Sequence, residues 1–225
     1  MKKNKVVLSA LFLICSVCVF IVLPACNTGK SGDGQKVVDI ESLPQVSAAK
    51  IFVADGSNEK IQLTRSGKLF SLLTKAGLVF FSGDEISNIS DKIVSISGVV
   101  HDCRFSLKPS VKASFEENSV TVIQGGMQMC FNKVNGVFKL SVPTATIGIR
   151  GTRLDVHVSH DKKSILTLHE GKITVDQNGK ETAVNPGETV QIDPDKKTLT
   201  VEKTTDDLLK AFDRISSDSI QKILR

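Results

Sequence analysis

The sequence predicts an all-β fold: an antiparallel sandwich or roll, or a short β-solenoid of many short strands, followed by a C-terminal amphipathic α-helix. From Lys50 onward, apolar alternation comes in runs of about five residues that are separated by turn residues. Several turns carry specific signals, such as Asn178-Gly179, a strong hairpin dipeptide, and Asn185-Pro186-Gly187, which suits a type II turn. Only Ser66–Ala76 is long enough for a helical crossover, so a parallel α/β sheet is disfavoured.

The expected strands share an alternating or continuous apolar pattern. They are Ile51–Val53, Leu78–Phe81, Ile93–Ile96, Val120–Ile123, Met127–Phe131, Val137–Val142, Leu154–Val158, Ile165–His169, Ile173–Val175, Val190–Ile192 and Leu199–Val201. Gly125-Gly126 predicts a two-residue hairpin turn, because both glycines tolerate positive φ. Together these strands define a β domain over residues 50–201.

The C-terminal residues 202–225 have a helical pattern instead. Thr204 or Thr205 can cap a helix, and Asp206 and Asp207 fall in its first turn, where the helix dipole favours acids. Apolar residues from Leu208 onward share one broad face. We expect this face to pack on the β domain or on a second copy of the chain; a docking helix for a partner is the alternative.

The N-terminus has the layout of a lipoprotein signal peptide over residues 1–25. A short basic segment precedes an uncharged apolar run from Val6 to Leu23. Leu23-Pro24-Ala25-Cys26 resembles the lipobox of bacterial lipoproteins, in which the cysteine is acylated and becomes the first mature residue. The alternative is a signal-anchor helix, since the run is close to the length that spans a membrane. We expect Cys26 to carry the lipid, and the glycine-rich residues 26–49 to form a flexible tether.

Charge and aromatic content disfavour a nucleic-acid partner. The chain carries a net charge of +5, but without Lys2, Lys3 and Lys5 of the signal peptide 26 basic residues face 24 acidic ones. That balance offers no basic stripe for phosphates. The sequence has no Trp and no Tyr on which single-stranded bases could stack.

Two cysteines remain outside the N-terminal region. Cys15 and Cys18 lie in the apolar run, and Cys26 is the expected anchor, which leaves Cys103 and Cys130. In an oxidising compartment this pair could form a disulfide that stabilises the fold by about 3 kcal/mol. Two buried free thiols are the alternative.

The stretch from Val142 to Val158 predicts a strand, a tight corner and a second strand. Gly148 and Gly151 bracket Arg150, and Thr152 follows, so one large cation is presented on a backbone that can bend on both sides. The guanidinium could bind a partner's carboxylate in a bidentate manner. Alternatively, it pins the corner through backbone carbonyls or through Asp155 or Glu170.

The block Val142-Pro143-Thr144-Ala145-Thr146-Ile147-Gly148-Ile149-Arg150-Gly151-Thr152 resembles the central motif of the FecR domain family. The later segments Leu168–Val175 and Asn185–Ile192 resemble the strands and glycine turns that follow it in that family, and Gly83-Asp84 resembles an early turn. The resemblance implies an extracytoplasmic all-β module. In the best-known members this module receives a signal from an outer-membrane receptor and passes it to a cytoplasmic domain that controls a sigma factor.

We expect only the binding module to carry over to this chain. No residues for a cytoplasmic domain precede the apolar segment, and a cleaved lipoprotein has no helix through the membrane. The expected role is a non-enzymatic lipoprotein of a bacterial envelope, facing the periplasm or the exterior, with the outer membrane favoured. It would bind another envelope protein or a polymer and need no cofactor. A structural subunit that self-associates through its C-terminal helix is the alternative.

A metal-dependent enzyme is the third hypothesis. His157, His160 and His169 could meet Asp161 on one polar sheet face, but their spacing matches no established zinc pattern. Alternation places His157 and His169 away from the apolar face, so we expect solvated histidines and no metal site.

Overall fold

The computed structural model describes residues 37–134 and 136–213, and for residues 211–213 the backbone alone. Cys26, the predicted signal peptide and the last part of the predicted C-terminal helix lie outside these residues. The described chain is nearly all β, with 17 strands, a short 3₁₀ turn η1 (Ile40–Ser42) and one helix, α1 (Asp206–Asp213). The all-β class is confirmed.

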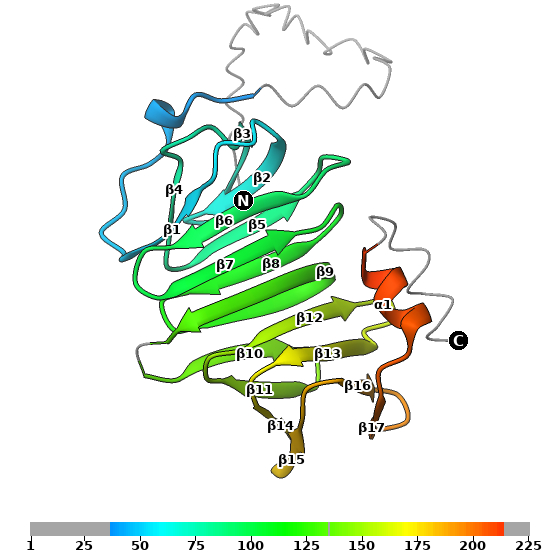
Figure 1. Cartoon of the computed structure of the whole chain (residues 1–225). Coiled ribbons are helices and arrows are strands. Elements are labelled where there is room, and N and C mark those ends of the chain that lie inside the picture. Colours follow the sequence, from blue (N-terminus) through cyan, green and yellow to red (C-terminus); the bar gives the residue numbers. More distant parts are fainter. Residues whose placement is uncertain (1–36, 135, 214–225) are drawn as a thin grey trace, which may run out of the picture. The chain divides into compact units, whose positions relative to one another are not determined.

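The strands pair into two sheets that share the long strand β9 (Ser119–Lys133) (Figure 1). Sheet A has the order β3 (Lys68–Leu73), β2 (Lys60–Arg65), β5 (Asp84–Asn88), β8 (Lys112–Glu116), β9, β10 (Phe138–Val142), β11 (Ala145–Ile149), β14 (Ile173–Gln177) and β15 (Lys180–Val184). Sheet B has the order β4 (Val79–Phe81), β1 (Lys50–Ala54), β6 (Val94–Gly98), β7 (Asp102–Leu107), β9, β12 (Arg153–Val158), β13 (Ser164–Glu170), β16 (Glu188–Asp193) and β17 (Thr198–Lys203).

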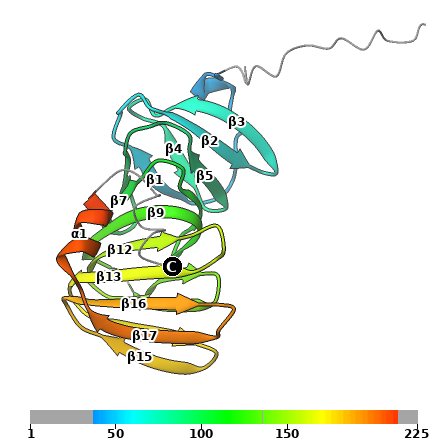
Figure 2. The same cartoon turned by 90° about the vertical axis from the view of Figure 1, so that its right-hand side faces the viewer.

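Successive hairpins alternate between the sheets in the second half of the chain. The pairs β10–β11 and β14–β15 lie in sheet A, whereas β12–β13 and β16–β17 lie in sheet B (Figure 2). Among the described strand pairs, only β9 and β10 run parallel. The chain leaves sheet A along β9, ends that strand in sheet B, and then returns through a loop so that β10 lies beside the first part of β9 in sheet A. The fold is therefore built by repeated crossings between two layers.

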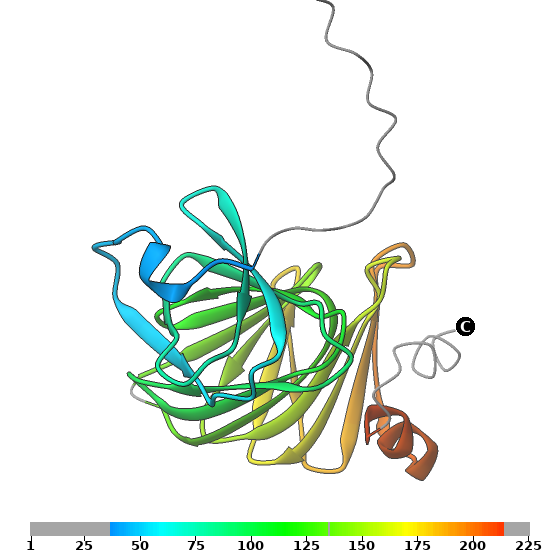
Figure 3. The same ribbon diagram turned by 90° about the horizontal axis from the view of Figure 1, so that it is seen from above.

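The two sheets face each other across one hydrophobic core (Figure 3). Inward positions alternate with outward ones, as in β2, whose Ile61, Leu63 and Arg65 are buried while the residues between them are not. Phenylalanines join the layers: Phe52 of sheet B stacks edge-on against Phe105 at 5.0 Å and against Phe115 of sheet A at 5.4 Å. Such aromatic pairs add about 0.5–1.5 kcal/mol each to the burial term.

The predicted hairpin turn at Gly125-Gly126 is wrong. The chain does not reverse there: β9 continues through both glycines and passes from sheet A to sheet B. Gly125 has a φ of 82°, and a Cβ at this position would lie 2.6 Å from Val111 Cα. The glycine permits a close backbone approach where β9 changes sheets, and the β8–β9 pairing has its irregularity next to it, at Ile123.

The expected ends of the β domain also shift. Strand β17 extends to Lys203, and α1 begins at Asp206, where Thr205 Oγ1 accepts the Leu208 amide proton at 3.3 Å. The described helix ends at Asp213, and residues 214–225 lie outside the description. At the other end, Val38 donates to the Ser71 carbonyl at 2.8 Å and Leu43 is buried. Val38 and Leu43, inside the segment expected to be a tether, are therefore packed on the β domain.

No helix within residues 37–134 and 136–213 has the length and apolar character needed to cross a membrane.

Candidate functional site

The corner expected around Arg150 is a crossing from sheet A to sheet B. Strand β11 ends at Ile149 and β12 begins at Arg153. Gly151 has a φ of 65°, and Thr152 is buried. A Cβ on Gly171, which lies on the next crossing, would come within 2.3 Å of the Gly151 carbonyl oxygen. The two crossings therefore stack directly on each other, which requires glycine at position 171.

Gly148 does not bend the chain. It lies inside β11, paired with Thr174 on one side and Lys139 on the other, and its φ is not positive. A Cβ there would meet nothing within 4 Å. The glycine bracket predicted on both sides of Arg150 is therefore real only at Gly151.

Arg150 is exposed and makes no hydrogen bond or ion pair with the rest of the described chain. The acids expected to hold it are engaged elsewhere: Asp155 Oδ2 lies 2.7 Å from His169 Nε2, and Glu170 Oε1 lies 3.5 Å from Arg153 Nη1. Arg150 therefore does not pin the corner. Its side chain is presented to the surroundings, as the recognition hypothesis requires.

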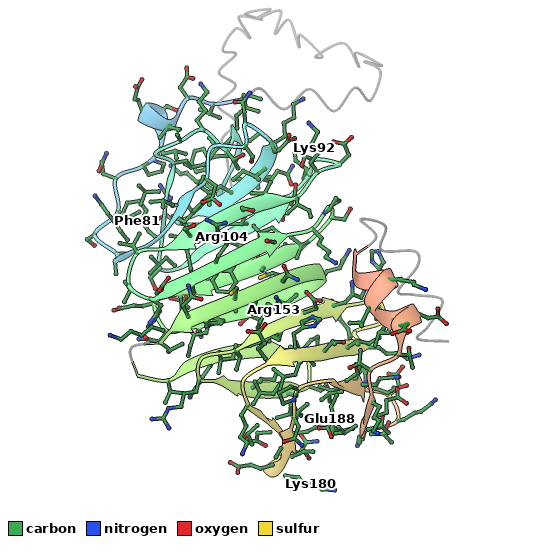
Figure 4. All side chains as sticks on the ribbon, in the orientation of Figure 1. Phe81, Lys92, Arg104, Arg153, Lys180 and Glu188 are labelled. Atoms are coloured by element: carbon green, nitrogen blue, oxygen red, sulfur yellow. The ribbon has the colours of Figure 1, made fainter. Side chains whose placement is uncertain are left out.

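Cys103 and Cys130 are free thiols in the structure. Cys103 pairs with Phe131 and shares its inward face, whereas Cys130 pairs with the exposed Arg104 on the outer face of sheet B (Figure 4). The register directs the two side chains to opposite faces of neighbouring strands, which agrees with the free-thiol alternative, although Cys130 is only partly buried. Burial, with a contribution from Asp102, raises the pKa of the Cys103 thiol to about 12.

The expectation of solvated histidines is wrong for His157. This side chain is 2% exposed, because the outer face of sheet B is itself covered at β12 and β13, and the Lys108 side chain lies near it beside Gly126. Leu208 of α1 is buried with 4% exposure. Burial, with smaller contributions from Lys108 and His160, lowers the pKa of His157 to about 4.

The four residues considered for a metal site are not brought together. His169 contacts Asp155, while Asp161 accepts from the Ser159 hydroxyl and lies 3.3 Å from Lys163 Nζ. Among the residues that the structure describes, no group of three or more His, Cys, Asp or Glu side chains could hold a metal ion.

A pocket that the sequence analysis did not predict lies near the start of the domain. It has a volume of about 490 Å³ and is lined by Gln45, Val46, Ser47, Ala48, Arg65, Ser66, Ser82, Gly83 and Asp84. Its floor is a buried ion pair: Arg65 Nε donates to Asp84 Oδ1 at 2.9 Å and Nη2 donates to Oδ2 at 2.6 Å. Arg65 also lies 4.7 Å from the centroid of the Phe81 ring, which adds a cation–π contact.

Two signals for this pocket were present in the sequence. Ser66-Gly67 is a turn dipeptide, and it forms the β2–β3 hairpin with Ser66 at a φ of 51°. Gly83-Asp84 was assigned to a turn as well. That these two turns meet could not be predicted, because β2 pairs with β5 across the intervening β3 and β4.

No protein-family profile and no curated protein matches the chain in sequence. Two crystal structures, each described as a "putative anti-sigma factor" from Parabacteroides distasonis, are similar in fold. The first superposes with a TM-score of 0.50 at 14% identity and the second with 0.49 at 15% identity. Each alignment covers 57% of this chain and 63% of the neighbour, so the chain matches less than two thirds of the neighbour's length.

The similarity to the first structure shows a shared fold. At 14% identity it carries no residue role to this chain.

Proposed function

We propose that this chain is a lipid-anchored, extracytoplasmic binding module of the FecR type, which engages another protein of a bacterial envelope without catalysing a reaction. The lipobox-like segment at Cys26 supports the anchor. The fold shared with an anti-sigma factor structure supports a sensing or binding module.

The observation that carries the proposal is the open edge of sheet B at β17. This strand pairs with β16 on one side and with no described strand on the other. Five of its six residues are exposed, and Thr198 to Val201 are uncharged. Glu202 and Lys203 carry charge at the end of the strand, so the unprotected part of the edge is Thr198 to Val201. An uncharged edge invites pairing with another chain unless charge or cover protects it.

The matching edge of sheet A offers a shorter uncharged run. Strand β15 begins with Lys180 and Glu181 and leaves three uncharged residues, against four in β17 (Figure 4). Charged residues on an edge discourage strand addition. We therefore infer that a partner adds an extended segment to β17, where backbone hydrogen bonds supply affinity and alternate side chains supply specificity.

The alternative is an assembly subunit that associates through its C-terminal helix. The packing of α1 favours the binding module over this alternative, because Leu208 is already buried within its own chain. A helix whose first apolar residue is covered has less of its face available to a second copy.

The test is site-specific photo-crosslinking in native envelopes. A photoreactive residue at Val201 is expected to capture one partner protein, and the same residue at Thr146, exposed on the fully paired strand β11, is expected to capture none. With the photoreactive residue kept at Val201, Thr200→Lys on the same edge strand should lower capture at least fivefold. If the only captured protein is a second copy of the chain, the result would support the assembly-subunit hypothesis. Capture from Thr146 but not from Val201 would refute the proposal that the partner binds at the β17 edge. The mass of the mature N-terminal peptide reports acylation of Cys26.

A further inference from the structure

The pocket at Arg65 lies at the opposite end of the strand order from β17. It is framed by three segments that are distant in sequence: residues 45–48, the β2–β3 turn and the β4–β5 turn. Two hydrogen bonds fix this frame, since Ser82 donates to the Ala49 carbonyl at 2.9 Å and Gly83 donates to the Phe115 carbonyl at 2.9 Å. The pocket is thus built from ordered backbone, and its volume lies within the range of about 300–1,000 Å³ that small-ligand sites cover.

The floor of the pocket offers hydrogen-bond donors from a buried cation. Arg65 is 3% exposed, and it uses Nε and Nη2 on Asp84 and the Val79 carbonyl. Its Nη1 group makes no contact with any described residue. A guanidinium has five donors, so two N–H groups of a nearly buried side chain remain to be satisfied.

The charges of the pocket select the class of acceptor. Asp84 balances Arg65, and every other lining residue is uncharged. A ligand carboxylate would approach the Asp84 carboxylate in a partly desolvated site, which is unfavourable. A neutral carbonyl oxygen can accept from Nη1 without this repulsion.

The remaining wall supplies unpaired backbone. Residues 45–48 make no backbone hydrogen bond with other described residues, although the segment is held at both ends by Leu43 and Ala49. Free N–H and C=O groups along this exposed segment can hydrogen-bond to the amides of another polypeptide. Ser47 and Ser66 add hydroxyls that can donate or accept.

We propose that this pocket is a second binding site, which takes an uncharged peptide segment with one backbone carbonyl on Arg65 Nη1 and its flanking amides along residues 45–48. The site is independent of the β17 edge, so it stands or falls separately from the proposed function.

The experiment is NMR titration of the full chain in detergent micelles with three probes: N-acetyl-trialanine amide, N-acetylglucosamine and acetate. The peptide is expected to shift the amide signals of Ser47, Ser66 and Gly83 and the Nε–H signal of Arg65, while acetate and the sugar leave them unchanged. Binding of acetate or the sugar with no response to the peptide would overturn the assignment, as would no response to any probe at millimolar concentration.

A matched pair of variants locates the site. Ala48→Trp places a large side chain in the pocket lining, whereas Ala49→Trp places it one residue outside the lining on the same exposed segment. We expect the first variant to weaken peptide binding at least tenfold and the second to leave it unchanged. Equal effects of both variants, or of neither, would overturn the placement.

Discussion

His157 makes the stability of this protein depend on pH in a predictable direction. Its imidazole is 2% exposed and its Nε2 atom has no hydrogen-bond partner among the described residues. Lys108 and His160 oppose a positive charge there, and burial opposes it more strongly. The folded state therefore holds His157 neutral, with a pKa of about 4 against a usual value of 6.5.

The unfolded chain binds this proton more readily than the folded chain does. Between pH 6.5 and pH 4 the unfolded state carries more protons, so the free energy of unfolding falls as the pH falls through this window. A shift from 6.5 to about 4 corresponds to a loss of about 2 kcal/mol between pH 7 and pH 5. Above about pH 7 this contribution is constant.

Urea unfolding at both pH values tests the reasoning, with His157→Phe as the isosteric ring that cannot be protonated. We expect the variant to lose about 2 kcal/mol less than the natural chain between pH 7 and pH 5. His160→Gln removes the smallest of the three contributions to the lowered pKa of His157, so it should keep most of the natural pH dependence. Equal losses in the natural chain and in His157→Phe would refute the assignment.

Three further predictions concern the crossing, the thiols and the exposed arginine. Gly171→Ala combines a φ of 89° with a backbone clash, so it should lower the free energy of unfolding by about 3 kcal/mol. The control Gly179→Ala has a φ of 81° but lies in open space, so it should lower the free energy of unfolding by about 1 kcal/mol. Equal urea midpoints for the two variants would contradict the close stacking of the two crossings. In the native protein iodoacetamide should modify Cys130 first and Cys103 only after unfolding, as followed by peptide mass mapping; equal rates would count against the register. Arg150→Ala should change the melting temperature by under about 2 °C, and a larger loss would show that the side chain holds structure after all.

The positions of the strands could be predicted from local patterns, because alternation and turn chemistry act over a few residues. Asn178-Gly179 forms the β14–β15 hairpin, and Gly187 with its φ of 80° lies in the expected turn before β16. The failure at Gly125-Gly126 has the same local origin. Two glycines permit either a chain reversal or a continuous strand with a close backbone approach. The pairing of β9 with β7 and β12 decides between these conformations, and a local pattern does not contain that pairing.

The candidate sites were harder to predict, because burial of a sheet's outer face cannot be read from alternation. The pattern of β12 placed His157 correctly on the face opposite Leu154 and Val156. The solvation of His157 depends on neighbours such as Lys108, which lies about 50 residues earlier in the chain and reaches it through strand pairing. Likewise Arg65 and Asp84 gave no individual signal, since each is an ordinary charged residue beside a turn, and their contact depends on β2 pairing with β5.

The strand order sets the distance between the N-terminal side of the described chain and the open edge at β17. The described chain begins at Val37, which bridges to Ser71 on β3 at one end of sheet A, and the open β17 edge lies at the other end of sheet B. Each sheet contains nine strands at about 4.8 Å spacing, so about 40 Å of paired backbone separates its first edge from its last. If a partner adds to β17 as we propose, this span sets its distance from the N-terminal side of the described chain.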